Sequence, residues 1–173
     1  MNQIESGFVP RAAHAHRARS AGFTVVEMLT VVAIFGILAT TAAPSFSSLI
    51  ASKRAETAAT DLYVALVDSR SEATKRNASA TLAPKSGGWQ VGWQMSVVDP
   101  NNSANTLTLG DHSVTNNVTV TGPDNVVYQS SGRVQASTNP VFVVTVTSGS
   151  NTEQRWVCVD LSGRPMVKSS ACP

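Results

Sequence analysis

The sequence of 173 residues has little charge, few aromatic residues and only two cysteines. Charged residues make up 14% of the chain, well below the roughly 25% that is usual in soluble domains. Two cysteines are too few for a disulfide-dense miniprotein or for a zinc module with several cysteine ligands. The hydrophobic fraction of 42% is still large enough to form a buried core, which argues against general disorder.

The residue patterns of catalysis are also missing. The chain contains no G-x-S-x-G, C-x-x-C, Walker or H-E-x-x-H motif. His112 is the only histidine after residue 22, and the Asp-His-Ser stretch around it is typical of a turn. We therefore expect no enzymatic activity, no metal and no cofactor.

The formal net charge of +2 is concentrated at the N-terminus. Residues 1–22 carry Arg11, Arg17 and Arg19 against Glu5, whereas the rest of the chain balances ten basic against ten acidic side chains. The basic pI of about 8.7 therefore describes the uncleaved chain, whose excess of basic residues lies in the N-terminal segment. The pI is therefore no general argument that the rest of the chain binds nucleic acid.

An apolar segment follows this basic start. Residues 23–43 are FTVVEMLTVVAIFGILATTAA, in which Glu27 is the single charge. A helix of this length is about 31 Å long, close to the ~30 Å hydrocarbon thickness of a bilayer. Arginines before the segment favour a cytoplasmic N-terminus and translocation of the residues that follow.

Composition alone leaves three interpretations of this segment open. It is a secretory signal cleaved on its C-terminal side, an uncleaved signal anchor, or an anchor cleaved on its N-terminal side. Pro44 disfavours the first, and the second gives no reason for Glu27. A carboxylate near the bilayer centre costs about 2.5–3.5 kcal/mol, so Glu27 is either hydrated at the membrane edge or paired with a cation that assembly supplies.

The residues around position 22 carry a specific resemblance. The sequence AGFTVVEML, residues 21–29, resembles the prepilin peptidase site of type IV pilins and type II secretion pseudopilins. The resemblance implies cleavage after Gly22, methylation of the new N-terminal Phe23, and a role for Glu27 in assembly. Gly36 and Pro44 match the helix-weakening positions of the long N-terminal helix in that family.

After Pro44 the apolar pattern becomes one-sided. Apolar residues recur every three or four positions, which predicts an amphipathic helix over 45–77. Lys75 and Arg76 suit a helix C-terminus, and Asn77 suits the position where the helix stops. The predicted buried stripe consists of Phe46, Leu49, Ile50, Ala55, Ala58, Ala59, Leu62, Ala65, Leu66 and Ala73.

The residues at the end of this helix resemble one particular group of pilins. The sequence DSRSEATKRN, residues 68–77, is similar to the helix-end signature of GspH/FimT-type pilins, which is close to ARSEAxKRN. In that group a C-terminal β-domain of two packed sheets follows the helix. The resemblance therefore implies a leader peptide over 1–22, a transmembrane or filament-core helix over 23–44, an amphipathic helix over 45–77 and a head domain over 78–173.

The composition of residues 78–173 agrees with a β-rich domain, because valine, threonine, asparagine, serine and glycine dominate it. Trp89, Val91 and Trp93 begin an alternating pattern that is typical of a half-buried strand. We predict an α+β fold, in which a long pilin helix packs on an antiparallel β-rich head. The predicted strands cover residues 78–83, 89–98, 106–109, 117–121, 126–129, 141–147, 155–160 and 166–168.

Cys158 and Cys172 lie in the segment that is expected to be exported, where disulfides are permitted. A bridge between them would close a loop of about 15 residues and contribute about 3 kcal/mol, and two free thiols are the alternative. Similar C-terminal bridges in pilins and minor pilins favour the disulfide.

The resemblance implies a minor pilin or pseudopilin of a type IV pilus or a type II secretion system. Its expected partners are prepilin peptidase, other minor pilins or pseudopilins, the inner-membrane assembly platform and membrane lipid. It is expected to insert in the inner membrane with a periplasmic head, and then to enter a filament near the tip.

DNA binding during natural transformation is the alternative function. Some FimT-type pilins bind DNA through a C-terminal G-R-x-R motif, of which Gly163 and Arg164 are present whereas Met166 replaces the second arginine. Arg133, Arg164 and Lys168 are the candidate phosphate contacts.

Overall fold

The computed structural model describes residues 22–99, 102–115, 117–149 and 151–173, with the backbone alone for 41–45, 103 and 104. The predicted leader, apart from Gly22, lies outside the described residues. The chain divides into two compact units, Met1–Ala39 and Thr40–Pro173.

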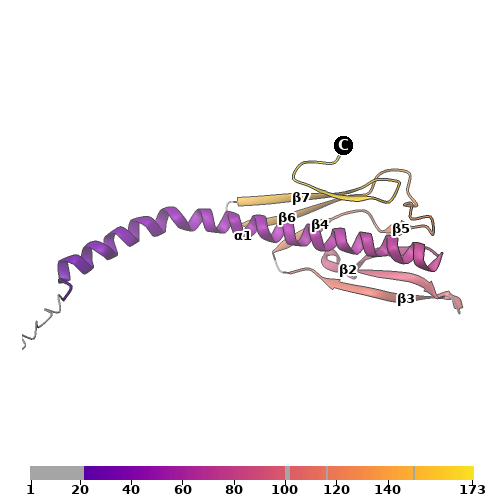
Figure 1. The fold of residues 1–173 in the computed structure, drawn as a ribbon, viewed down its shortest axis with the longest axis horizontal. Helices are drawn as coiled ribbons and strands as arrows, with labels where there is room; N and C mark the ends of the chain where they lie inside the picture. Colours follow the sequence, from indigo (N-terminus) through magenta and orange to yellow (C-terminus); the bar gives the residue numbers. More distant parts are fainter. Residues whose placement is uncertain (1–21, 100–101, 116, 150) are drawn as a thin grey trace, which may run out of the picture. The chain divides into compact units, whose positions relative to one another are not determined.

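Helix α1 spans Val25–Arg76 and includes both Gly36 and Pro44 (Figure 1). The two positions predicted to weaken the helix therefore do not end it. No helix in the described part of the chain has the length and apolar character needed to cross a membrane. The transmembrane half of the helix stays a prediction.

The predicted stop at Asn77 is confirmed. Asn77 has a φ of 50°, in the left-handed region, and its N–H donates to the carbonyl of Thr74 at 3.3 Å. The N–H of Ala78 donates to the carbonyl of Ala73 at 3.2 Å. These two bonds form the Schellman arrangement, which satisfies the last carbonyls of the helix and turns the chain into the first strand.

Strands form in all eight predicted places, and all their pairings are antiparallel. One sheet has the order β3-β2-β1-β5 and the other β4-β6-β7-β8. The predicted α+β fold with two sheets is confirmed. The strands are β1 (Ala80–Lys85), β2 (Gly88–Asp99), β3 (Asn102–Ser113), β4 (Val118–Thr121), β5 (Val126–Tyr128), β6 (Val141–Ser148), β7 (Asn151–Val159) and β8 (Pro165–Lys168).

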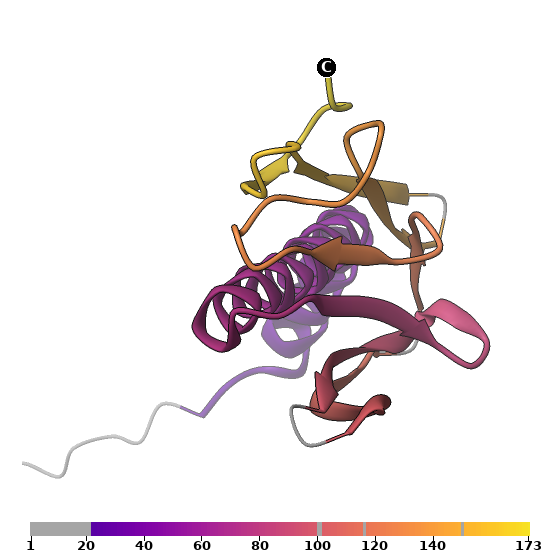
Figure 2. The same ribbon diagram turned by 90° about the vertical axis from the view of Figure 1, so that its right-hand side faces the viewer.

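Within residues 40–173, α1 packs against both sheets and shares one core with them. In Figures 1 and 2 the β2–β3 hairpin lies below this part of the helix, and β7 and β8 lie above it. Burial of apolar surface from both sheets against one helix face holds the unit together. The core includes Ala55, Ala59, Leu62 and Leu66 of the helix, Leu82, Trp93 and Val97 of the first sheet, and Phe142, Val144 and Val157 of the second.

The predicted apolar stripe of the helix is wrong at its N-terminal end. Phe46, Leu49 and Ile50 are 63%, 55% and 48% exposed, whereas Ala51 is fully buried. The head covers the helix only from Ala51 onward, so helical periodicity alone places the stripe correctly but not its limit. The three exposed side chains remain available for contacts outside this unit.

The predicted alternation along β2 also fails at one residue. Trp89 and Trp93 are buried, but Val91 is 44% exposed. Gly92 has a φ of 140°, and the pairing of β2 with β1 changes register at the C-terminal end of β1. An irregularity therefore lies between the two tryptophans, and it turns Val91 to the opposite face of the sheet. Trp89 packs edge-on against Phe142 of the other sheet, with ring centroids 4.9 Å apart.

Candidate functional site

The residues predicted to be processed lie just before the helix. Gly22 and Phe23 are exposed, Phe23 to 74%, and α1 begins at Val25. The bond between Gly22 and Phe23 therefore lies in non-helical backbone, which an enzyme can bind in extended form. Among the described residues, nothing lies within 4 Å of a Cβ built at Gly22.

Glu27 closes the N-terminal turn of the helix together with Thr24. The Glu27 N–H donates to the Thr24 hydroxyl at 3.2 Å, and the Thr24 N–H donates to Glu27 Oε2 at 3.5 Å. This reciprocal arrangement is a capping box, which satisfies two donors that a helix start leaves free. The T-x-x-E spacing of residues 24–27 is the usual sequence signal for this motif, which was not among the predicted features.

The helix around Glu27 is apolar on all sides. In water a helix with this character leaves a large apolar surface exposed. Side chains at least 40% exposed include Val25, Val26, Met28, Leu29, Val31, Val32, Ile34, Phe35, Ile37 and Leu38.

A second candidate site lies where two loops of the head meet. Gly132, with a φ of 75°, follows β5, and Gly163, with a φ of 86°, lies between β7 and β8. A Cβ at Gly163 would overlap the Gly132 carbonyl. Both residues therefore need to be glycine, because each has left-handed backbone and the loops are in direct contact.

Arg70 of α1 fixes these two loops to the helix. Its Nε donates to the carbonyl of Gly132 at 3.1 Å, and its Nη2 donates to the carbonyl of Ser162 at 3.2 Å. The guanidinium suits this task because its donors lie in a rigid plane. Arg70 is thus a positioning residue for the loops, a role that its place in the helix-end signature does not indicate.

The turn between β7 and β8 has its own support in Asp160. The Asp160 carboxylate accepts hydrogen bonds from the Ser162 hydroxyl at 2.6 Å and from the Arg164 N–H at 2.9 Å. These bonds, that of Ser162 first, lower the pKa of Asp160 below its usual value. The turn at Gly163-Arg164 is therefore a well-defined structure.

The structure brings together two of the three candidate DNA-binding residues. Arg133 and Arg164 each follow one of the touching glycines, and both are exposed. Lys168 is half-buried at the far end of β8, where it pairs with Trp156 of β7. We call the segments Ser131–Arg133 and Ser162–Arg164 the arginine loops.

Two sequence profiles match the chain. That of the family described as type II transport protein GspH matches residues 58–163, and that of the prokaryotic N-terminal methylation motif matches residues 17–43. The chain belongs to the GspH family. GspH-type subunits are structural pilin-class proteins that prepilin peptidase processes and that assemble with other pilins from a membrane-anchored state.

Solved structures of pilin-class proteins resemble this GspH-family chain. Two crystal structures of the type IV minor pilin FimU of Pseudomonas aeruginosa PAO1 have TM-scores of 0.54 and 0.57, with 21% and 20% identity. They cover 68% and 70% of this chain and 96% and 93% of FimU.

The minor pseudopilin EpsH from the Type 2 Secretion System of Vibrio cholerae has a TM-score of 0.54 at 12% identity, covering 67% of this chain and 97% of EpsH. At these identities the similarity concerns the fold. No curated protein sequence matches the chain significantly.

The helix-end signature of this GspH-family chain has a physical explanation. Ser69 is fully buried and donates to the Ala65 carbonyl at 2.7 Å, so a larger residue would not fit against the sheets. Glu72 forms ion pairs with Arg76 at 2.8 Å and Lys75 at 3.1 Å, which lower its pKa. Together with Arg70 and Asn77, these residues build the helix end on which the arginine loops rest.

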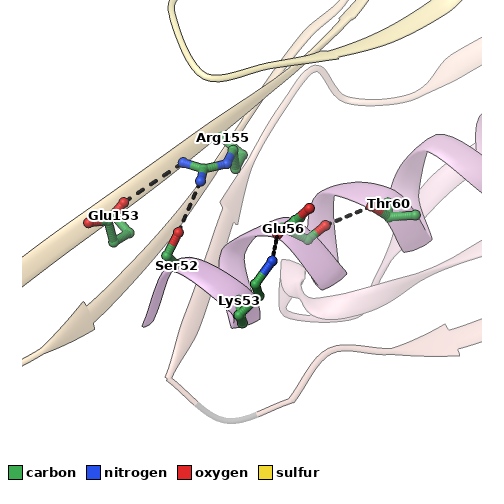
Figure 3. A network of polar contacts seen from close by, with 6 residues as sticks. All are labelled: Ser52, Lys53, Glu56, Thr60, Glu153 and Arg155. Atoms are coloured by element: carbon green, nitrogen blue, oxygen red, sulfur yellow. Dashed lines mark hydrogen bonds and ion pairs between the residues drawn. The ribbon is translucent and has the colours of Figure 1, made fainter. Parts of the chain in front are cut away.

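A second polar link joins the helix to the other sheet of this GspH-family head. Figure 3 shows Arg155 of β7 reaching toward Ser52, whose hydroxyl accepts a hydrogen bond from Nη2 at 3.0 Å. Arg155 also lies 3.8 Å from Glu153 on the same strand. On the helix, Lys53 forms a 2.8 Å ion pair with Glu56. This link fixes the part of α1 where coverage by the head begins.

The predicted disulfide between Cys158 and Cys172 is present in this GspH-family chain. Cys158 is 4% exposed on β7, and the bridge holds the C-terminal tail to that strand. Among the described residues, no group of three or more histidine, cysteine, aspartate or glutamate side chains is arranged to hold a metal.

Proposed function

We propose that this chain is a minor pilin or pseudopilin that inserts in the inner membrane and then enters a filament near its tip. In this proposal residues 1–22 are a leader that prepilin peptidase removes, and the head over 78–173 is periplasmic. The observation that carries the proposal is the helix start capped by Thr24 and Glu27, with apolar side chains around it, beside an exposed Gly22-Phe23 bond in a chain of the GspH family.

The apolar side chains of this helix need to be covered both before and after assembly. Lipid covers its apolar side chains before assembly, and neighbouring helices cover them in the filament. Gly36 and Pro44 are proposed as positions where the helix bends or unwinds as the subunit moves from the membrane into the filament. The platform and the neighbouring subunits are the proposed partners of the transfer.

Substitutions at Glu27 test the proposal. We expect Glu27→Val to be processed and inserted normally but to enter filaments about tenfold less, because it removes both the charge and the capping box. Glu27→Gln keeps a capping-box acceptor and removes only the charge, so it separates the two roles. Immunoblots of sheared filaments measure incorporation, and N-terminal sequencing confirms that each variant begins at Phe23.

If Glu27 acts through the charge, the Gln variant fails like the Val variant. If it acts only as a cap, the Gln variant assembles normally. Unchanged incorporation of the Val variant, or a mature start at Met1 or near Pro44, contradicts the proposal.

DNA binding during uptake is the second candidate function. What favours it is the contact between Gly132 and Gly163, which brings Arg133 and Arg164 onto one exposed surface. Two exposed arginines on touching loops suit contact with phosphates. Met166 at the place of the second motif arginine weakens the case.

A mobility-shift experiment on the full chain tests the DNA hypothesis. We expect duplex DNA to bind with an affinity that falls as salt rises, and Arg164→Ala to weaken binding several-fold. Arg54→Ala on α1 removes the same charge elsewhere and serves as the control. Absence of binding at about 50 mM salt, where phosphate contacts are strongest, contradicts this function.

A further inference from the structure

A cavity of about 450 Å³ lies between the last turns of α1 and the loop that follows β5. In Figure 1 this strand lies beside the end of the helix, and Arg70 joins the two segments through the Gly132 carbonyl. We call this space the helix-end cavity. Apart from Val67 and Gly132, the residues that line it all carry hydrogen-bond donors in their side chains, and they are Arg70, Ser71, Thr74, Lys75 and Ser131.

The helix-end cavity differs in charge from the cavities between α1 and β3. Among the described residues that line it there is no aspartate or glutamate, whereas each cavity beside β3 contains Asp61 or Asp68. Carboxylates repel an anion at close range. Of these cavities, the one at the helix end therefore offers an anion the least repulsion.

His112 belongs to the β3 side and does not lie in the turn in which it was expected. It lies on β3 and stacks on Trp93, with ring centroids 4.4 Å apart, and its Nε2 lies 3.7 Å from Asp61 Oδ2. A short sequence window missed this because β3 extends beyond its apolar residues, to Ser113. The imidazole therefore adds no cation to the helix-end cavity.

Several donors of the helix-end cavity are not used within the chain. Arg70 donates to the loops through Nε and Nη2, whereas its Nη1 has no hydrogen-bond partner among the described residues. The Ser71 hydroxyl also has none in that part of the chain. Lys75 and Arg76 share one carboxylate, that of Glu72, which leaves one positive charge in excess. Charged and hydroxyl donors around a space without a carboxylate suit an oxyanion such as phosphate.

The surface around the helix-end cavity has a basic excess. The segments 70–76, 131–133 and 160–164 contain five basic and two acidic residues. The two acids are already engaged, Glu72 in ion pairs and Asp160 in hydrogen bonds within its turn. A helix C-terminus carries a partial negative charge, but here the Schellman arrangement satisfies the last carbonyls. The local charge therefore favours an anion.

We propose that the helix-end cavity binds a phosphate group, which belongs either to a DNA backbone or to free phosphate. Arg70 and Lys75 supply the positive charge, and the hydroxyls of Ser71 and Ser131 donate to the remaining oxygens. Such sets of basic and hydroxyl side chains are the usual protein contacts of phosphate.

The arginine loops border this cavity. Gly132 lines it and contacts Gly163, and the exposed Arg133 and Arg164 are the next residues along the chain. A DNA strand with one phosphate in the cavity therefore has further phosphates within the same basic surface. For DNA the inference rests on the second candidate function, and it adds residues of α1 that the G-R-x-R motif does not contain.

Two neighbouring substitutions test the site in the detergent-solubilised full chain. Lys75→Gln removes the ammonium group from the cavity, and we expect duplex DNA to bind about fivefold more weakly, with a salt dependence lower by about one phosphate contact. Arg76→Gln is the matched control, because it removes the same charge from the same partner, Glu72, but does not line the helix-end cavity. Its affinity for DNA is expected to change less than about twofold. Fluorescence anisotropy at several salt concentrations measures both variants.

Ser71→Ala separates the cavity from the general charge of the surface. It removes a hydroxyl donor and leaves every charge in place, and alanine suits a helix. We expect DNA to bind about threefold more weakly, with an unchanged salt dependence. An unchanged Tm without ligand shows that the variant is folded. DNA binding equal to that of wild type would show that the phosphate does not enter the cavity.

Thermal unfolding tests free phosphate. In about 50 mM phosphate, compared with chloride of the same ionic strength, wild type and Arg76→Gln are expected to unfold about 2 °C higher. Lys75→Gln is expected to gain less than half of this. The general salting effect of phosphate is common to all variants, so only the difference between them reports binding.

The two measurements distinguish the source of the phosphate. A loss of DNA affinity in Lys75→Gln but not in Arg76→Gln supports the DNA backbone. A phosphate-specific gain without any DNA binding supports free phosphate and contradicts the second candidate function.

Other outcomes overturn the proposal. These are equal effects of Lys75→Gln and Arg76→Gln in both measurements, and a wild type that responds to neither ligand. If only Arg164→Ala weakens DNA binding, the proposal fails while the second candidate function stands.

Discussion

Gly163→Ala is expected to lower the free energy of unfolding of this chain by about 3 kcal/mol. Part of the loss comes from backbone conformation, because a φ of 86° costs an L-residue about 1–2 kcal/mol. The rest comes from the overlap of the new methyl group with the Gly132 carbonyl, since forcing an atom into a packed site costs about 1–3 kcal/mol. Urea unfolding followed by tryptophan fluorescence measures the change.

Gly149→Ala is the matched control. Gly149 also has positive φ, at 62°, but no atom of the described residues lies within 4 Å of the position of a new Cβ. It is therefore expected to lose only about 1–2 kcal/mol, the conformational part. Equal losses in the two variants would show that the contact between Gly132 and Gly163 does not affect stability.

Cys172→Ala is expected to lower the free energy of unfolding by about 3 kcal/mol, because the bridge to Cys158 restricts a loop of about 15 residues in the unfolded chain. Cys172 lies in the C-terminal tail, so the substitution leaves the buried Cys158 in place. The same urea experiment, with and without dithiothreitol, measures the change.

The reductant provides the internal control for the disulfide. It is expected to bring wild type to the stability of Cys172→Ala and to leave the variant unchanged. If the variant lost stability but reduction of wild type did not, the effect would come from the side chain and not from the bridge.

Of the two features behind these stability predictions, the sequence indicates the disulfide but not the contact between the two loops. The disulfide was expected from family resemblance, and the strand that it joins was expected from its pattern. The contact between Gly132 and Gly163 was not expected, because nothing in either loop identifies the other. Glycine in each loop favours a turn, but a turn shows where the chain reverses and not what it then meets.

The apolar stripe of α1 also shows which features local sequence indicates and which depend on distant segments. Spacing of three and four residues identifies the buried face of α1, since each residue turns the helix by a fixed angle. Where burial begins depends on how far the sheets extend along the helix. Arg155 and Ser52 lie at that boundary, 103 residues apart in the sequence.

The sequence by itself determined what local periodicity and local chemistry encode. These features are the basic start, the apolar segment with Glu27, the amphipathic helix that stops at Asn77, and the succession of strands. Each depends on residues a few positions apart, where backbone geometry fixes the relation between side chains.

Only the tertiary structure decided which distant groups meet. Arg70 binds carbonyls 62 and 92 residues further along the chain, and His112 stacks on Trp93 and approaches Asp61. The order of strands in two sheets around one helix sets these contacts, and no short segment contains that order.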